Sequence, residues 1–162
     1  MTRSPSMMST LPLQARDAVA AIIVVDGEGY LLQHRDDLPE IWYPDHWGCF
    51  GGAMEPGETP EAALQRELDE ELGCGRLAMR RFASLNFDVP ILGPATIVRH
   101  YYEVTVTSGE VERFVLGEGR AMTCVDREGV LCGLRVVPYD AFALFLHIGR
   151  DRFAPATSGS GA

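Results

Sequence analysis

Three glutamates stand close together near the middle of the chain, in the segment ELDEEL that ends at Leu72. Glu67, Glu70 and Glu71 are spaced i, i+3 and i+4, which places them on one side of a helix. Carboxylates that share a partly dry surface repel one another, and the repulsion grows as water is excluded. The group therefore favours a positive partner, either the neighbouring Arg66 or a hard divalent cation that prefers oxygen ligands. A solvated acidic helix face, the usual form of Glu-rich helices, is the alternative.

A helix over residues 60–72 would position these carboxylates. Thr59 can cap its start, Pro60 suits the first helical position, and Gly73 is placed to end it. An apolar stripe runs along the helix, since leucine recurs every fourth residue at positions 64, 68 and 72. The stripe predicts that one face of the helix packs against a core.

The position of each glutamate relative to this stripe predicts its exposure. At about 100° per residue, Glu67 and Glu71 border the leucines, whereas Glu70 points further away. Glu67 and Glu71 are therefore expected to be partly desolvated neighbours. The side chain of Arg66 is expected to lie off the side that these two glutamates share.

The stretch from Gly51 to Cys74 resembles the Nudix box, a signature written G-x5-E-x7-R-E-U-x-E-E-x-G-U in which U is a bulky aliphatic residue. Cys74 departs from the final aliphatic position, where a cysteine can act as a small hydrophobic residue. The other fixed positions are all matched, by Gly52, Glu58, Arg66, Glu67, Leu68, Glu70, Glu71 and Gly73.

The resemblance implies an α/β fold of the Nudix type, an α/β/α sandwich with a mixed, partly curled sheet between helices. The expected domain covers residues 16–152, between a flexible leader at 1–15 and a flexible tail at 153–162. The residue pattern agrees, because apolar and alternating segments predict strands before and after the helix. The expected strands cover residues 17–25, 30–35, 47–51, 77–89, 95–107 and 122–126, and a closing helix covers residues 138–150.

Two further expectations concern the second half of the chain. Ser108 to Glu110 is expected to form a turn that leads into residues 111–116. In the closing helix, Phe142 and Leu146 are expected to belong to the core.

The resemblance also implies an activity, the hydrolysis of a phosphoanhydride bond in a nucleoside diphosphate linked to another moiety. Such a substrate could be a nucleotide sugar, ADP-ribose or a nucleoside triphosphate. Bound Mg²⁺, with Mn²⁺ able to replace it, would neutralise the phosphates and acidify a water molecule. Glu67, Glu70 and Glu71, together with Arg66, are the expected catalytic residues, and the sequence leaves open which carboxylate is the general base.

The same three glutamates are expected to hold the metal. By resemblance, the carbonyl of Gly51 and an acidic residue from a later loop, in a Glu-Gly-x setting, complete the metal shell. Glu118 matches that setting, and Glu110, Glu112 and Asp126 are weaker rivals. A Glu between glycines is otherwise an ordinary solvated loop residue.

Structural roles are expected at three other positions of the box. Gly52 allows the backbone to approach a ligand closely, and Gly73 ends the helix. Glu58 is expected, by resemblance, to pair with Arg66 and to hold the loop in shape.

Four residues before the box are candidates for substrate contact. Arg35 stands at the end of an expected strand, where an Arg often lies near the substrate in the resembled family, and it could bind phosphate. Trp42 and Tyr43 lie in the loop 36–46 and Trp47 follows it, so their rings could stack on a base. Aromatic residues in such loops more commonly cover the edge of a core.

The substrate and the class of function each have an alternative. Pro90 lies sixteen residues beyond Cys74, close to a position where ADP-ribose-cleaving families carry a proline, and it slightly favours a nucleoside diphosphate sugar over a triphosphate. The alternative function is a catalytically silent Nudix module that senses a nucleotide. Such modules are expected to lose carboxylates of the box, and none is missing here.

The composition limits the classes of partner and of chemistry. The chain has 162 residues and a net charge of −9, and all of its basic residues are Arg, which excludes Schiff-base and P-loop chemistry. The acidic balance argues against long nucleic acid but allows a small nucleotide whose charge a metal neutralises. No apolar run predicts a membrane span.

The four cysteines form no CxxC pair and are expected to be buried, reduced thiols in a cytoplasmic protein. A homodimer is compatible with the sequence.

Overall fold

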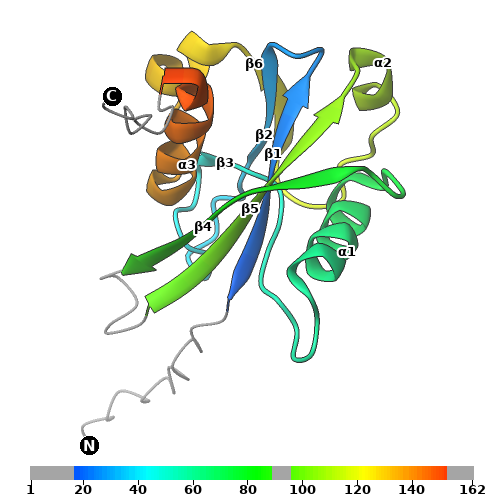
Figure 1. Ribbon diagram of the computed structural model, residues 1–162, viewed down its shortest axis with the longest axis vertical. Coiled ribbons are helices and arrows are strands. Elements are labelled where there is room, and N and C mark those ends of the chain that lie inside the picture. Colours follow the sequence, from blue (N-terminus) through cyan, green and yellow to red (C-terminus); the bar gives the residue numbers. More distant parts are fainter. Residues whose placement is uncertain (1–16, 89–95, 153–162) are drawn as a thin grey trace, which may run out of the picture.

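The computed structural model describes residues 17–88 and 96–152 and places a sheet between two helices (Figure 1). Helix α1 (Pro60–Leu72) covers one face and helix α3 (Pro138–Ile148) covers the other, which confirms the expected sandwich. The expected leader and tail lie outside the described residues. The remaining elements are β1 (Ala18–Val25), β2 (Gly29–His34), β3 (Trp47–Gly48), β4 (Met79–Asp88), β5 (Thr96–Val106), α2 (Ser108–Val111), β6 (Ala121–Val125), the π-helical turn η2 (Gly129–Gly133) and the 3-10 turn η3 (Arg150–Arg152).

The strands form a mixed sheet in the order β3-β2-β1-β5-β4, and β6 also pairs with β2. Strands β1 and β5 are parallel, from Ala18 opposite Arg99 to Val25 opposite Val106. The other pairs are antiparallel. Parallel neighbours need a crossover connection rather than a hairpin. Here that connection carries the long loop and α1, so the chain path itself places α1 against the sheet.

Strand β1 is buried along its whole length, because the sheet is covered on both sides. Successive side chains of a strand point to opposite faces. A strand buried on both faces needs a continuous apolar run, which residues 18–25 provide. Val19, Ala21, Ile23 and Val25 pack on the side of α1, and Ala20, Ile22 and Val24 pack on the side of α3.

Helix α1 begins and ends where the sequence predicts. The hydroxyl of Thr59 accepts a hydrogen bond from the N–H of Ala62 at 3.2 Å, and Pro60 is the first helical residue. Gly73 ends the helix in the left-handed region, with a φ of 57°, which glycine adopts without strain. Ala63, Leu64, Leu68 and Leu72 are buried against the sheet.

Helix α3 buries a different face from the one expected. Phe142 is 50% exposed, so its assignment to the core is wrong, and Leu146 is only partly buried. The buried face instead carries two polar residues, Asp140 and His147, beside Ala143 and Leu144. Polar residues can occupy a buried face when each finds a hydrogen-bond partner, and only the tertiary structure supplies those partners.

The segment after β5 also differs from the expectation of a simple turn. Residues 108–111 form the short helix α2, because Thr107 and Glu110 bond reciprocally as a capping box. The following residues contact the end of α1, where the N–H of Val115 donates to the carbonyl of Leu72 at 2.9 Å. The chain therefore passes beside the acidic helix before it enters β6.

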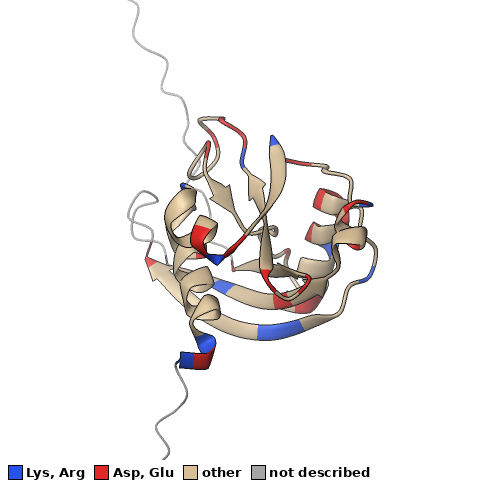
Figure 2. Cartoon of the chain, turned by 90° about the horizontal axis from the view of Figure 1, so that it is seen from above, with Lys and Arg blue, Asp and Glu red and all other residues tan. Residues whose placement is uncertain are grey.

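The four cysteines are free, and only Cys49 is fully buried. The expectation of burial is wrong for Cys124 and Cys132, which are exposed on β6 and η2. None of the helices within residues 17–88 and 96–152 has both the length and the apolar character needed to cross a bilayer. In the view of Figure 2, acidic residues are spread over helices and loops, and the basic residues of the described part are scattered among them.

A buried ion pair joins α3 to the sheet. Arg99 on β5 donates from Nε to Oδ1 of Asp140 at 3.1 Å, and both side chains are almost fully buried. Oδ1 of Asp140 also accepts from the hydroxyl of Tyr101, and Oδ2 accepts from the N–H of Cys49 at 3.0 Å. Asp140 therefore fixes α3 to β5 and to the chain segment that leads into the box.

Asp140→Ala should lower the free energy of unfolding by about 3–5 kcal/mol, because it leaves the buried Arg99 without its carboxylate. Urea unfolding followed by tryptophan fluorescence measures the change. Asp151→Ala removes the same charge from the exposed turn η3 and should cost less than about 0.5 kcal/mol. Equal stability of the Asp140 variant and the wild type would contradict the role given to this pair.

Candidate active site

Two glycines bring the loop before α1 into close contact with its surroundings. A Cβ on Gly51 would lie 2.3 Å from the carbonyl oxygen of Val19, and the φ of Gly51 is 128°, a value that favours glycine. A Cβ on Gly52 would lie 2.5 Å from a carboxylate oxygen of Glu67. The loop can therefore pack against the backbone of β1 only because Gly51 lacks a side chain, and the bare Gly52 lets the Glu67 carboxylate lie against the loop.

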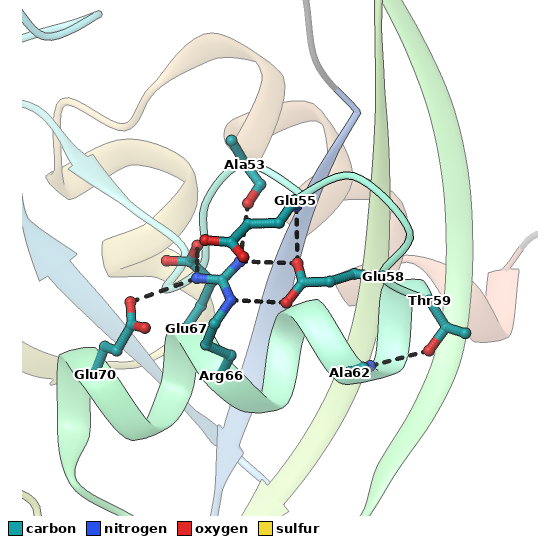
Figure 3. Close-up of polar contacts among 8 residues, drawn as sticks. All are labelled: Ala53, Glu55, Glu58, Thr59, Ala62, Arg66, Glu67 and Glu70. Carbon is teal, nitrogen blue, oxygen red and sulfur yellow. Dashed lines mark hydrogen bonds and ion pairs between the residues drawn. The ribbon is translucent and has the colours of Figure 1, made fainter.

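Arg66 is the centre of a polar network that joins this loop to α1 (Figure 3). Its Nε and Nη2 donate to the two carboxylate oxygens of Glu58 at 2.8 and 3.0 Å, so the expected pair is present as a bidentate contact. Nη2 also donates to the carbonyl of Ala53 at 3.1 Å. Nη1 donates to Glu67 at 2.8 Å and to Glu70 at 3.4 Å.

The expected direction of the Arg66 side chain is wrong with respect to Glu67. Neighbouring helical residues point about 100° apart, but the arginine side chain is long enough to fold back over the next residue. Its guanidinium neutralises part of the charge on Glu67, whereas the hydrogen-bond partners of Glu71 are other groups.

The network shifts the pKa of its members. The hydrogen bonds from Arg66, followed by the one from the N–H of Glu55, lower the pKa of Glu58 to about 2. The same contact with Glu58 raises the pKa of Arg66. The two side chains therefore stay charged under all ordinary conditions and act as a fixed brace for the loop.

Glu71 is the most deeply buried acid of the helix, at 4% exposure. Its Oε2 accepts from the N–H of Gly51 at 2.7 Å, and its Oε1 accepts from Nε2 of Gln33 at 3.2 Å. Burial raises the pKa of Glu71 to about 8, and the charges of Glu67 and Glu118 act in the same direction. The expected placement of Glu71 beside the leucine stripe is therefore observed.

Glu67 is half-buried, and Glu70 is exposed. Burial raises the pKa of Glu67, and the charges of Glu70 and Glu118 raise it further, against the opposing effect of Arg66. Two acids with raised pKa values on adjacent turns of one helix mark a candidate functional site.

Glu118 lies close enough to raise the pKa values of both Glu67 and Glu71. Its side chain is exposed, and its backbone carbonyl accepts from Nε2 of Gln33 at 3.0 Å. The rival Glu110 is engaged in the capping box of α2. Of the later acids weighed from the sequence, Glu118 is thus the one that acts electrostatically on the box.

The chemistry of these groups fits a hard divalent cation. Their oxygens are the ligands that Mg²⁺ prefers, their charges repel one another, and the bare backbone of Gly52 leaves room beside Glu67. The acids are bonded to protein groups, and within residues 17–88 and 96–152 no three His, Cys, Asp or Glu side chains converge on one metal position. Metal binding by Gly51, Glu67, Glu70, Glu71 and Glu118 stays a prediction.

Three of the four candidate substrate residues are neighbours. Arg35 donates from Nε to the carbonyl of Trp42 at 3.1 Å. The ring of Tyr43 meets that of Tyr139 on α3 edge-on, at 5.7 Å. Trp42 packs with Ala18, Ile97 and Phe87, and its Nε1 is buried without a hydrogen-bond partner among the described residues.

Trp47 lies on β3. One face of its ring stacks on His34, with centroids 4.6 Å apart and planes 11° from parallel. His34 in turn contacts Asp45 at 3.0 Å. The structure therefore joins Trp47 to β2 through this stack, and its contact with a substrate stays a prediction.

Gln33 is a site residue that was not predicted from the sequence. It is the polar residue at the end of an apolar run, YLLQ, and is 5% exposed. The signal in the sequence that could have indicated it is a polar residue at the end of the apolar run of an expected strand. Its two partners, Glu71 and Glu118, could be identified only in the folded chain.

The model of the NUDIX domain family matches residues 15–155, which is most of the chain. The protein belongs to the NUDIX family. This assignment rests on the whole domain and not on the box alone.

Relatives and solved structures agree with this assignment. The chain is 43% identical over 61 residues to nucleoside triphosphatase NudI of Enterobacter sp. (strain 638) and 41% identical to NudI of Escherichia coli O1:K1. Each match covers 38% of this chain and 42% of the relative, so the chain spans about two fifths of these relatives.

Among solved structures, the MutT protein of Methanosarcina mazei Go1 aligns with a TM-score of 0.69 at 20% identity, over 88% of this chain and 99% of that one. At that identity the match shows the fold alone. A MutT NUDIX hydrolase of Burkholderia pseudomallei aligns with a TM-score of 0.67 at 26% identity, over 82% and 97% of the two chains.

In the metal-free protein, stability should fall as the pH rises from about 5 to about 8. The folded protein keeps the proton of Glu71 up to a pH of about 8, whereas the unfolded chain releases it near the ordinary value of 4.5. The unfolded state therefore binds fewer protons in this window, and the expected loss is on the order of 4 kcal/mol. Urea unfolding in chelator at several pH values measures it.

Glu71→Gln should flatten this profile, because the amide keeps the shape of the side chain and does not ionise. Asp69→Asn, at an exposed position of the same helix, should leave the profile steep. A profile that is equally steep in both variants would contradict the burial assigned to Glu71.

Proposed function

We propose that this NUDIX protein is a magnesium-dependent pyrophosphohydrolase that cleaves a phosphoanhydride bond of a nucleoside triphosphate. The observation that carries the proposal is the position of two acids against the glycine loop before α1. The N–H of Gly51 donates to Glu71, and Gly52 lies against the carboxylate of Glu67. Glu118 lies near enough to raise the pKa of both acids. The close approach of acids that raise one another's pKa costs free energy in the protein alone. A cation that binds among them, together with the phosphates it carries, would offset this cost.

The metal, when bound, supplies charge neutralisation and lowers the pKa of a water molecule. Glu67 and Glu71 would hold it as primary ligands, and the Gly51 carbonyl and Glu118 would complete the shell. Mn²⁺ should replace Mg²⁺, since both accept carboxylate and water oxygens. The brace of Glu58 and Arg66 would keep the loop in position whether or not a metal ion is bound.

A general base must be free to take a proton from the attacking water. A carboxylate that is locked on a metal is a poor base, so the role falls to an acid outside the primary shell. Glu70 is exposed, and its contact with Arg66 is long, at 3.4 Å, which leaves its carboxylate free to act as base or as ligand. Arg66 instead fixes the orientation of Glu67, through a contact of 2.8 Å.

Relatives support a triphosphate as the substrate. The NudI proteins that match over 61 residues are nucleoside triphosphatases, and this outweighs the slight preference for a nucleotide sugar that Pro90 suggested. Pro90 lies outside the described residues. A NUDIX domain of Shewanella oneidensis NrtR complexed with ADP ribose matches at 15% identity, which supports the fold alone.

A silent nucleotide-sensing module is the alternative. It would have no need for an acid such as Glu71, whose burial is unfavourable without a positive partner. The retention of Glu67, Glu70 and Glu71, in the arrangement described above, favours the enzyme.

Glu71→Gln should reduce turnover at least 100-fold in the presence of Mg²⁺, while circular dichroism shows an unchanged fold. Asp69→Asn is the matched control, because it makes the same change of charge at an exposed position of the same helix. Its turnover should stay within about twofold of the wild type. Near-normal turnover of the Glu71 variant would rule out Glu71 as a ligand.

A screen that follows the formation of the nucleoside monophosphate by anion-exchange chromatography should identify the substrate class. With Mg²⁺, nucleoside triphosphates should be cleaved faster than nucleotide sugars, ADP-ribose or dinucleotides. Excess chelator should abolish the reaction, because the anhydride oxygens are then not neutralised. Activity that survives chelation would contradict the metal-dependent mechanism, and faster cleavage of a nucleotide sugar would contradict the proposed substrate.

A further inference from the structure

Gln33 joins two parts of the candidate site that lie far apart in the sequence. Its Nε2 donates to Oε1 of Glu71 at 3.2 Å and to the backbone carbonyl of Glu118 at 3.0 Å. The backbone carbonyl of Glu118 can only accept a hydrogen bond, so the nitrogen of the amide has to face it, and the same nitrogen reaches Oε1 of Glu71. The side-chain amide of Gln33 thus donates one hydrogen bond to α1 and one to the segment of residues 117–120.

The direction of the Gln33 side chain follows from its place on β2. Leu31 packs on the side of α1 and Leu32 on the side of α3. Alternation along the strand therefore turns Gln33 toward α1, as its contact with Glu71 shows. A buried amide at this position is stable only with hydrogen-bond partners, and the site supplies them.

The segment that carries Glu118 fits tightly between α1 and β2. The N–H of Gly117 donates to the carbonyl of Glu71 at 2.8 Å, and a Cβ on Gly117 would lie 2.2 Å from the carbonyl oxygen of Glu70. Gly119 has a φ of 83°, and its Cβ would lie 2.9 Å from Cγ of Gln33. Both glycines are needed for this close approach.

The far end of the segment is fixed as well. The N–H of Arg120 donates to the carbonyl of His34 at 2.8 Å, and its Nη1 contacts Asp45 at 2.7 Å. Backbone hydrogen bonds therefore hold both ends of residues 117–120. Between the two glycines, the side chain of Gln33 donates a hydrogen bond to the carbonyl of Glu118.

We propose that Gln33 is a positioning residue that sets the separation between the Glu71 carboxylate and the Glu118 segment. Through this bridge, acids from α1 and from the segment act on the same metal ion. The inference rests on the proposed function, because it concerns the metal site of that reaction. It goes further by assigning a role to a residue outside the box that itself is not a metal ligand.

The test compares Mn²⁺ binding to the full-length wild type and to Gln33→Met, by electron paramagnetic resonance. Methionine keeps the length of the side chain but forms neither hydrogen bond, so the affinity should fall about 10- to 100-fold. Gln33→Leu serves as a second variant if the first fails to fold. Tyr30→Phe is the matched control, since it removes one buried hydrogen bond of the same strand on the α3 side, to His147 at 3.0 Å. Its Mn²⁺ affinity should equal that of the wild type.

Two further readouts separate positioning from a general loss of stability. The turnover of Gln33→Met should recover as the Mg²⁺ concentration rises, because the defect lies in metal affinity. In the background of Glu118→Gln, the Gln33 substitution should lower Mn²⁺ affinity by a smaller factor than in the wild type, because the two residues are coupled.

The outcomes distinguish this inference from the proposed function. Wild-type Mn²⁺ affinity in both Gln33 variants, or an equal loss in Tyr30→Phe, would overturn the role of Gln33 and leave the proposed function intact. A wild-type protein that binds no Mn²⁺ would overturn the proposed function and the inference together.

Discussion

The burial of one acidic side chain, Glu71, is the constraint on which the rest of the site depends. A carboxylate at 4% exposure is costly unless nearby groups replace its lost water. The N–H of Gly51 and the amide of Gln33 do so, and they come from the loop before α1 and from β2. Three separate segments therefore have to meet at this side chain, and its pKa of about 8 shows that two hydrogen bonds do not fully compensate for burial.

The acids of the box are stabilised in two different ways. Arg66 forms ion pairs with Glu58 and Glu67, and the pair with Glu58 holds the loop in place. One guanidinium cannot serve all the acids around it, and the hydrogen bonds of Arg66 go to Glu58, Glu67 and Glu70 rather than to Glu71. The same helix thus combines a permanent ion pair, which maintains the loop, with the group of acids to which the proposed function assigns the metal.

Local signals made much of the fold predictable. Thr59 and Gly73 mark the ends of α1, and the continuous apolar run of β1 requires a sheet that is covered on both faces. The buried face of α3 could not be found in this way, because the hydrogen-bond partners that allow Asp140 to be buried, Arg99, Tyr101 and Cys49, come from distant segments. The contribution of Gln33 was missed for the same reason. Spacing along a helix predicts which acids are neighbours, but long side chains and partners from distant segments decide their contacts.

Diffraction from crystals soaked in Mn²⁺, measured at the manganese absorption edge, would locate a metal ion among the acids of the box. We expect an anomalous peak within about 2.5 Å of carboxylate oxygens of both Glu67 and Glu71, on the side facing Glu118. A fully ordered site without a peak, or a peak bound elsewhere with Glu71 still bonded as in the metal-free protein, would contradict this expectation.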